Sequence, residues 1–152
     1  MAVDVLDLID VDRYPVHLPA ADAYRALLAE TRAQLNDDGC AVLRGFVRAD
    51  RIADLVEEAD RVADKGHRSF NRTNVYFTRD NPDYPQDHPL RRFYDRSNSF
   101  VPADNFGADS CIRSIYEWPW FSAFVQQALD QDRFFRYADP LADVIVNVAE
   151  EG

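Results

Sequence analysis

The chain has 152 residues, a length that suits one domain with a core of its own. Its composition, 47% hydrophobic and 12% aromatic, is that of a folded protein and excludes a disordered one. The 17 basic and 27 acidic residues give a formal net charge of −10. Such a surface repels phosphate groups, which argues against nucleic acid or an anionic membrane as a partner.

The N-terminus is acidic and lacks the basic start and apolar core of a secretion signal. No apolar run approaches the length that spans a bilayer. The two cysteines, Cys40 and Cys111, match no metal-binding spacing, and we interpret them as buried free thiols rather than a disulfide. We therefore expect a cytoplasmic protein.

The first half predicts an arm, a helix, a strand and a second helix. Residues 1–18 are interpreted as an extended arm with a short edge strand at Val3–Ile9. A helix begins near Pro19, where proline suits the first turn, and ends near Asp37 with Gly39 as its left-handed cap. Its apolar stripe consists of Tyr24, Leu27, Leu28, Thr31 and Leu35.

The apolar run Cys40–Leu43 predicts a buried core strand against which the flanking helices pack. Asp50 is the expected N-cap of a second helix that ends at Gly66. The buried stripe of this helix is predicted to be Ile52, Leu55, Val56, Ala59, Val62 and Ala63. Its acidic residues, interpreted as a solvated face, are Glu57, Glu58, Asp60 and Asp64.

Residues 67–108 form an irregular, aromatic-rich region. Short strands are predicted at Asn74–Thr78 and Arg92–Phe100, joined by a proline-rich turn at Asn81–Pro89. So long a region is typical of a functional or mobile loop, and equally its aromatic side chains suit the cover of a core edge.

The C-terminal part predicts a helical unit over Asp109–Asp130, with Asp109 as its cap and Pro119 restarting the helix. A strand at Arg133–Tyr137, a turn at Asp139-Pro140 and a last strand at Asp143–Ala149 follow. Alternation places Val144, Val146 and Val148 on one face of the last strand, and Ile145 and Asn147 on the other.

Sequence motifs for chemistry are sparse. The residues two positions after the three histidines are Pro19, Ser69 and Leu90, so none supplies the acid of a His-x-acid metal site. Asp87-His88 before a proline is interpreted as a turn feature. There is no nucleophile elbow, phosphate-binding glycine loop or CxxC motif.

Two polar residues lie in strand-like surroundings. Asn147 interrupts a run of β-branched residues, and it is either a satisfied core amide or a group that points into a ligand cavity. Arg96 has the fork geometry that suits a carboxylate-bearing ligand. The alternative that composition favours for Arg96 is a salt bridge to Asp95 or another acid.

Several segments together resemble the iron(II)/2-oxoglutarate-dependent oxygenases, and in particular the branch of amino-acid hydroxylases and halogenases. The resemblance covers most of residues 25–152. Its segments, in chain order, are residues 38–46 (DGCAVLRGF), 115–119 (IYEWP) with Phe121 and Phe124, 137–141 (YADPL), 146–148 (VNV) and Gly152.

This resemblance implies N-terminal helices packed on a partial double-stranded β-helix, a cupin-like sheet, within a single α+β domain over residues 1–152. In the family, a His-x-Asp or His-x-Gly iron motif, a second histidine and a 2-oxoglutarate-binding arginine follow the strand that 144–148 resembles. The chain contains none of these after Val148, so the resemblance assigns no catalytic or metal residue. The resemblance implies only residues that line the pocket: Arg96 and Asn98 at the substrate, and Asn147 near 2-oxoglutarate.

We therefore expect a truncated or split oxygenase, with iron(II) and 2-oxoglutarate implied by the family but not bound by this chain alone. It would act on a small amino-acid-like substrate only when completed by the missing C-terminal half. An open strand edge invites a complementary chain or self-association. The alternative is a non-catalytic remnant or protein-interaction module that uses the same edge and aromatic loop.

Overall fold

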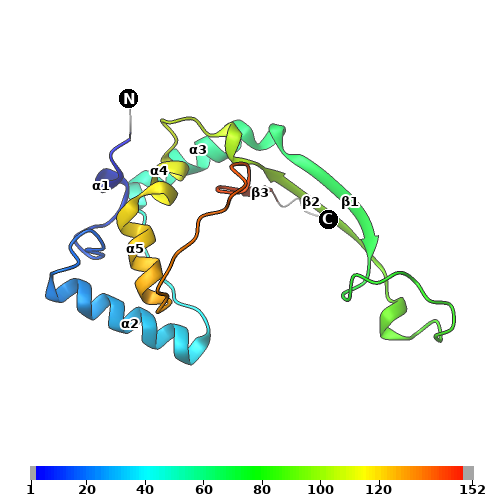
Figure 1. Cartoon of the computed structure of the whole chain (residues 1–152). Helices are drawn as coiled ribbons and strands as arrows, with labels where there is room; N and C mark the ends of the chain where they lie inside the picture. The colour runs from blue at the N-terminus through cyan, green and yellow to red at the C-terminus, as the bar shows by residue number, and fades with distance from the viewer. Residues whose placement is uncertain (1–2, 149–152) are drawn as a thin grey trace.

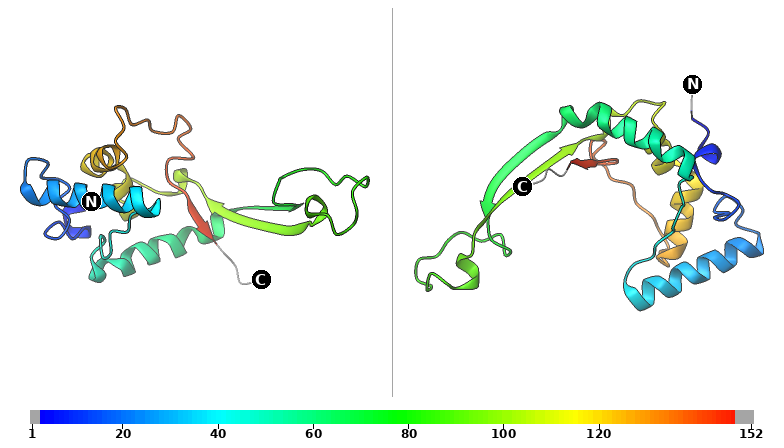
Figure 2. Two further views of the ribbon diagram at one scale, coloured as in Figure 1. Left: turned by 90° about the horizontal axis from the view of Figure 1, so that it is seen from below. Right: turned by 180° about the vertical axis from the view of Figure 1, so that it is seen from behind.

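A computed structural model describes residues 3–148 of the chain. Helices gather at one end, and a long two-stranded hairpin arches away from them and ends in an irregular loop (Figure 1, Figure 2). The α+β class predicted from the sequence is confirmed. The elements are α1 (Val5–Leu8), α2 (Asp22–Asp38), α3 (Ile52–Val62), β1 (His67–Thr73), β2 (Tyr94–Val101), α4 (Cys111–Glu117), α5 (Pro119–Ala128) and β3 (Val146–Val148).

The N-terminal arm does not form the predicted edge strand. Helix α1 takes its place because the side chain of Asp4 accepts the backbone N–H of Leu6 at 3.0 Å and caps the first turn. Ile9 forms a single β-bridge, with Val47. The arm also belongs to the core, since its fully buried residues are Leu8, Ile9 and Val16.

Helix α2 agrees with the sequence prediction at its C-terminus. Gly39 has φ +73° and its N–H donates to the carbonyl of Leu35 at 3.0 Å, which is the left-handed cap expected of glycine. Tyr24 and Thr31 of the predicted stripe are buried. The α2 stripe therefore faces the helical core as the spacing indicated.

The predicted core strand at Cys40–Leu43 is wrong. These residues have no regular secondary structure, Cys40 is exposed, and 55% of the Val42 side-chain surface is exposed. The N–H of Val42 donates to the side chain of Gln34 rather than to a neighbouring strand. Leu43 packs against the helical core, the chain turns at Gly45, and Phe46 and Val47 pack against the same core.

The helical core joins α1, α2, α4 and α5. Phe124 of α5 is 2% exposed, and its ring meets that of Tyr24 of α2 edge-on at 5.8 Å between centroids. Phe46 packs against Phe121 at 5.4 Å. The buried members of this cluster are Leu8, Ile9, Val16, Tyr24, Trp118 and Phe124.

Helix α3 buries only part of its predicted stripe: Val62 is buried, and Leu55, Ala59 and Ala63 are partly buried. Ile52 and Val56, predicted to be buried, are exposed, whereas Glu58, predicted to be solvated, is 7% exposed. The Glu58 carboxylate accepts the backbone N–H groups of Cys111 (2.9 Å) and Ile112 (3.2 Å). Glu58 thus satisfies the free N–H groups at the start of α4, which explains why a charged side chain is buried there.

The sheet is antiparallel with strand order β1-β2-β3. The predicted strand at Arg92–Phe100 corresponds to β2, but the one predicted at Asn74–Thr78 is wrong, because β1 occupies the seven preceding residues. At the base of the hairpin, a Cβ on Gly66 would come within 2.5 Å of the Ser99 hydroxyl. Glycine therefore permits the close approach of α3 to the sheet.

The C-terminal part agrees with the predictions except at one strand. Pro119 is the first residue of α5 as predicted, and the N-cap of α4 is Ser110, one residue after the expected Asp109. Residues 133–137 form no strand and are exposed, with 79% of Phe135 accessible. The last strand is β3; of its predicted range, Ala149 lies outside the described residues.

The molecule exposes more surface than a compact protein of its size. Its accessible surface is 10865 Å², whereas a compact monomer of this mass exposes about 7,900 Å² by the usual scaling law. Exposed apolar side chains account for part of the excess: Phe70, Val75, Tyr76, Phe77, Phe135 and Tyr137 are all more than half exposed. Within residues 3–148, no helix is long and apolar enough to cross a membrane.

Candidate functional site

One side of the sheet is left uncovered. Residues directly opposite in antiparallel strands share a face, so the register places Asn71 beside Arg96, and His67 and Asn147 on either side of Phe100. We call this side the open face and define it by these five residues. All of them except Phe100 are exposed, and Phe100 is half-buried.

The other side of the sheet is covered at its base. Val101, Val144 and Val62 of α3 are buried in one cluster, and Val146 and Val148 pack against it. The alternation predicted for the last strand is therefore confirmed, since its even-numbered valines point to this cluster while Ile145 and Asn147 are exposed. Polarity and packing thus distinguish the two sides.

Arg96 lies in the middle of β2 on the open face. Its guanidinium lies over the ring of Phe77, 5.6 Å from the centroid. Asp95 is the preceding residue of the strand and points to the other face, opposite Arg72, so it does not share a face with Arg96. An aromatic contact, not a bridge to Asp95, therefore positions this guanidinium.

The other two predicted site residues lie on β2 and β3. Asn147 is exposed, so it is not the satisfied core amide that was the alternative to a ligand role. Asn98 takes the register position opposite Ser69 in β1. The open face also holds three residues that the sequence did not assign to a site, Asn71, Phe100 and His67, and the His67 ring meets that of Phe100 at 5.4 Å between centroids. Only the register reveals His67, because β1 has no apolar alternation.

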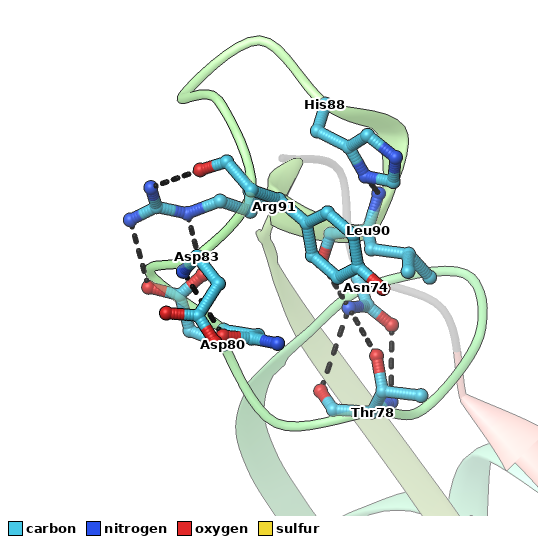
Figure 3. Close-up of polar contacts among 9 residues, drawn as sticks. Asn74, Thr78, Asp80, Asp83, His88, Leu90 and Arg91 are labelled. Carbon is cyan, nitrogen blue, oxygen red and sulfur yellow. Dashed lines mark hydrogen bonds and ion pairs between the residues drawn. The ribbon is translucent and has the colours of Figure 1, made fainter.

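The distal loop, residues 74–93 between β1 and β2, is built around one buried amide (Figure 3). The side-chain N–H of Asn74 donates to the Leu90 carbonyl at 2.6 Å and to the Thr78 hydroxyl at 2.9 Å. Its oxygen accepts the backbone N–H groups of Tyr76 (3.0 Å) and Thr78 (3.1 Å). The amide thereby fixes a turn in which Phe77 has φ +55°, a strained value for a bulky residue.

An ion pair holds the far side of the same loop. The guanidinium of Arg91 bonds both carboxylate oxygens of Asp80, at 2.8 and 3.1 Å, and donates to the Tyr84 carbonyl at 2.9 Å (Figure 3). The hydrogen bond to Asp80 raises the pKa of Arg91. Beside this pair lies an open groove of about 690 Å³, lined by Arg72, Asp80, Gln86, Arg91, Arg92 and Phe93.

The histidines do not assemble a metal site in the described part of the chain. Across residues 3–148, no three His, Cys, Asp or Glu side chains gather in a way that could hold a metal ion. His88 is the turn feature that the sequence indicated: its Nδ1 accepts the N–H of Leu90 at 3.2 Å, and its ring stacks on Tyr84.

The two cysteines are free, as predicted, but they differ in exposure. Cys40 is exposed, contrary to the expectation of two buried thiols, because the segment around it is not a core strand. Cys111 is half-buried, and burial together with the nearby Glu58 and Asp54 carboxylates raises the pKa of its thiol.

The two thiols are therefore expected to differ in reactivity. A raised pKa lowers the thiolate fraction at any given pH, so iodoacetamide at pH 7.5 should label Cys40 first and Cys111 only slowly. Labelling of Cys111 should accelerate as the pH rises toward 10. Mass spectrometry of time points in Cys40→Ser and Cys111→Ser variants measures each rate alone, and equal rates at pH 7.5 would contradict the difference in environment.

The open face and the groove beside the distal loop are thus two places where polar side chains gather on an exposed surface of the described chain. No protein-family model, curated protein or solved structure matches the chain.

Proposed function

We propose that the chain is the N-terminal part of an oxygenase of the iron(II)/2-oxoglutarate type, in which the open face forms a wall of the substrate pocket. The observation that carries this proposal is a sheet whose base packs on α3 on one side, while its open face is polar and exposed with aromatic rings beside the polar groups. A cupin-like barrel places such a face toward its interior. Further polypeptide has to complete the barrel.

The composition of the open face supports a pocket wall. Ligand pockets set a few polar groups among aromatic and apolar ones. The open face sets four polar side chains around Phe100, and Phe77 of the distal loop lies against Arg96. Of these polar side chains, the proposal assigns Arg96 and Asn147 to ligands. Arg96 would bind a substrate carboxylate, and Asn147 would lie near 2-oxoglutarate.

The separation of these two residues suits two different ligands. Asn147 is opposite Phe100, which is four residues along β2 from Arg96. At about 3.4 Å per residue, the two positions are roughly 14 Å apart along the strand. A single small ligand cannot bridge that distance, so the proposal assigns one end of the open face to the substrate and the other to the cosubstrate.

The strand pairing supports an incomplete sheet. Strand β3 pairs with β2 over Ser99–Val101, and within the described residues the same edge of β2 has no partner over 94–98. A strand edge of this kind is a template for further pairing. The excess accessible surface agrees with a layer that further polypeptide would cover.

The described residues do not fit an iron site, since they bring together no set of three ligands. The iron ligands and the arginine that binds 2-oxoglutarate would have to come from polypeptide beyond this chain. What the chain supplies is binding and orientation: a cation for the substrate and an amide beside the cosubstrate.

Co-production with the polypeptide encoded after the codon for Gly152, in the same or the next reading frame, tests this proposal. We expect a stable complex that binds iron(II) and 2-oxoglutarate with a metal-to-ligand charge-transfer band, and no such band from the present chain alone. In the complex, Asn147→Ala should weaken 2-oxoglutarate binding about tenfold, the effect of losing one good hydrogen bond in a buried site. The matched control is Asn36→Ala, an exposed residue of α2.

Two results would reject the oxygenase. One is a downstream sequence without a His-x-Asp or His-x-Gly motif and a later histidine and arginine. The other is a complex that assembles but binds no iron. The second candidate function, a protein-interaction module, is favoured by the exposed aromatic side chains Phe70 and Phe77 on the hairpin. Under that function a partner protein would cover these rings without iron or 2-oxoglutarate being bound.

A further inference from the structure

We propose that the outer edge of β1 and the adjoining arginine groove bind an extended acidic polypeptide segment. Its main chain would add to β1 as a further strand, and its carboxylates would contact Arg72 and Arg92. The edge, the charge of the hairpin and the rigidity of the distal loop support this partner.

Among residues 3–148, no strand pairs with the outer edge of β1. Strand β1 is the terminal strand of the sheet, with β2 on one side and no described strand on the other. Six of its seven residues are exposed. Its outward backbone N–H and C=O groups are therefore available to an added strand. Strand addition of this kind takes its affinity from main-chain hydrogen bonds and its specificity from side chains.

The charge of the hairpin selects an acidic partner. The chain as a whole has a net charge of −10, but residues 67–100 contain six arginines and four aspartates. Strand β1 itself includes Arg68 and Arg72 and no acid. An acidic segment is thus repelled by most of the molecule and attracted to the hairpin, which concentrates binding there.

The groove extends this positive surface beyond the end of β1. Arg72, Arg91 and Arg92 all line it, and its one carboxylate, Asp80, is bonded through both oxygens to Arg91. Arg72 and Arg92 remain as the cations that a partner carboxylate can reach. Because Asn74 and the Arg91–Asp80 pair fix the loop, the backbone that carries Arg92 is held in place before binding, which lowers the entropy lost on association.

The same edge disfavours a second copy of this chain. If two β1 strands paired antiparallel over all seven residues, Phe70 would lie opposite Phe70 and Arg68 opposite Arg72 at both ends. Like charges directly opposite in a sheet are destabilising. The partner is therefore a different, acidic chain or segment, and of the two modes expected from the sequence, self-association through this edge is the less favourable.

This binding site does not depend on the oxygenase proposal. The outer edge of β1 is one edge of the sheet. The unpaired part of β2, which the oxygenase proposal uses, belongs to the other edge. The acidic segment would bind in either case, so the two proposals can fail separately.

A ten-residue peptide of alternating valine and glutamate, with both termini blocked, tests the site. A peptide of the same length in which lysine replaces each glutamate is the control for charge. We expect the glutamate peptide to bind, the lysine peptide not to bind, and amide hydrogen exchange to slow at His67–Thr73. Arg72→Gln and Arg92→Gln should each weaken binding by roughly three- to tenfold, the range for one charge-assisted hydrogen bond at a partly exposed site. Arg79→Gln, which removes an arginine of the same loop outside the groove, should leave binding unchanged.

Three results would overturn this assignment. Equal binding of the lysine peptide would remove the charge selection. Binding of the glutamate peptide without protection of the β1 amides, or full competition by inorganic phosphate at the same concentration, would indicate an anion site without strand addition. If the β1 amides exchange more slowly as the concentration of the protein itself is raised, and sedimentation equilibrium shows a dimer, the edge would be assigned to a second copy of the chain.

Discussion

Phe124→Ala is expected to lower the free energy of unfolding by about 3–5 kcal/mol, the usual cost of truncating a buried phenylalanine. Phe124 is the largest fully buried side chain of the helical core, and its ring contacts Tyr24 across the α2–α5 interface. Total stabilities of single domains are about 5–15 kcal/mol, so this change removes a large part of the total. Urea unfolding followed by far-ultraviolet circular dichroism measures it.

Phe135→Ala is the matched control, because it makes the same chemical change at a ring that is 79% exposed. We expect this control to shift stability by no more than about 0.5 kcal/mol. Equal losses in the two variants would mean that the helical cluster is not the core that stabilises the chain.

Asn74→Ala is expected to destabilise the distal loop by about 2–4 kcal/mol, because it leaves the Leu90 carbonyl and two backbone N–H groups without their partner. The turn that holds Phe77 at positive φ would then relax. The Arg96 guanidinium would lose the ring beneath it. The amide thus couples the folding of the loop to the position of a candidate substrate-binding residue.

Amide hydrogen exchange distinguishes this cooperative effect from the loss of single hydrogen bonds. The N–H groups of Tyr76 and Thr78 lose their acceptor directly, so the informative amide is that of Arg91, which bonds the His88 carbonyl. We expect its exchange to accelerate at least about 30-fold, which corresponds to 2 kcal/mol. Asn71→Ala, at an exposed position on β1, should leave it unchanged. An unchanged Arg91 amide in Asn74→Ala would show that the loop does not open as one unit.

The sequence predicted the elements whose ends are set by local chemistry. Gly39 ends α2 because a left-handed cap favours glycine, and Pro119 starts α5 because its missing N–H costs nothing there. The alternation in β3 likewise placed Asn147 on the face opposite the valines. Each of these depends on residues within a few positions of one another.

Predictions that assumed burial failed where no other layer covers the segment. Cys40–Leu43 and residues 133–137 were predicted to be strands, yet neither segment pairs with another strand; Cys40, Val42 and all of residues 133–137 are exposed. The prediction that Glu58 is exposed was also wrong. Its carboxylate is buried because α4, more than fifty residues away in the chain, brings two backbone N–H groups to it. An apolar side chain favours burial and a charged one favours exposure, but the neighbouring elements determine whether the residue is buried in the fold.

For the candidate site, the sequence by itself determined which residue types are available: an arginine, two asparagines and the aromatic side chains around them. Only the tertiary structure decided that Arg96, Asn147 and His67 share one uncovered face, because that depends on pairing between residues as distant as His67 and Phe100, or Phe100 and Asn147. It also decided that Phe77, rather than Asp95, lies against Arg96. Register is set by contacts between distant segments, and no local pattern in β1 encodes it, since its side chains are exposed on both faces.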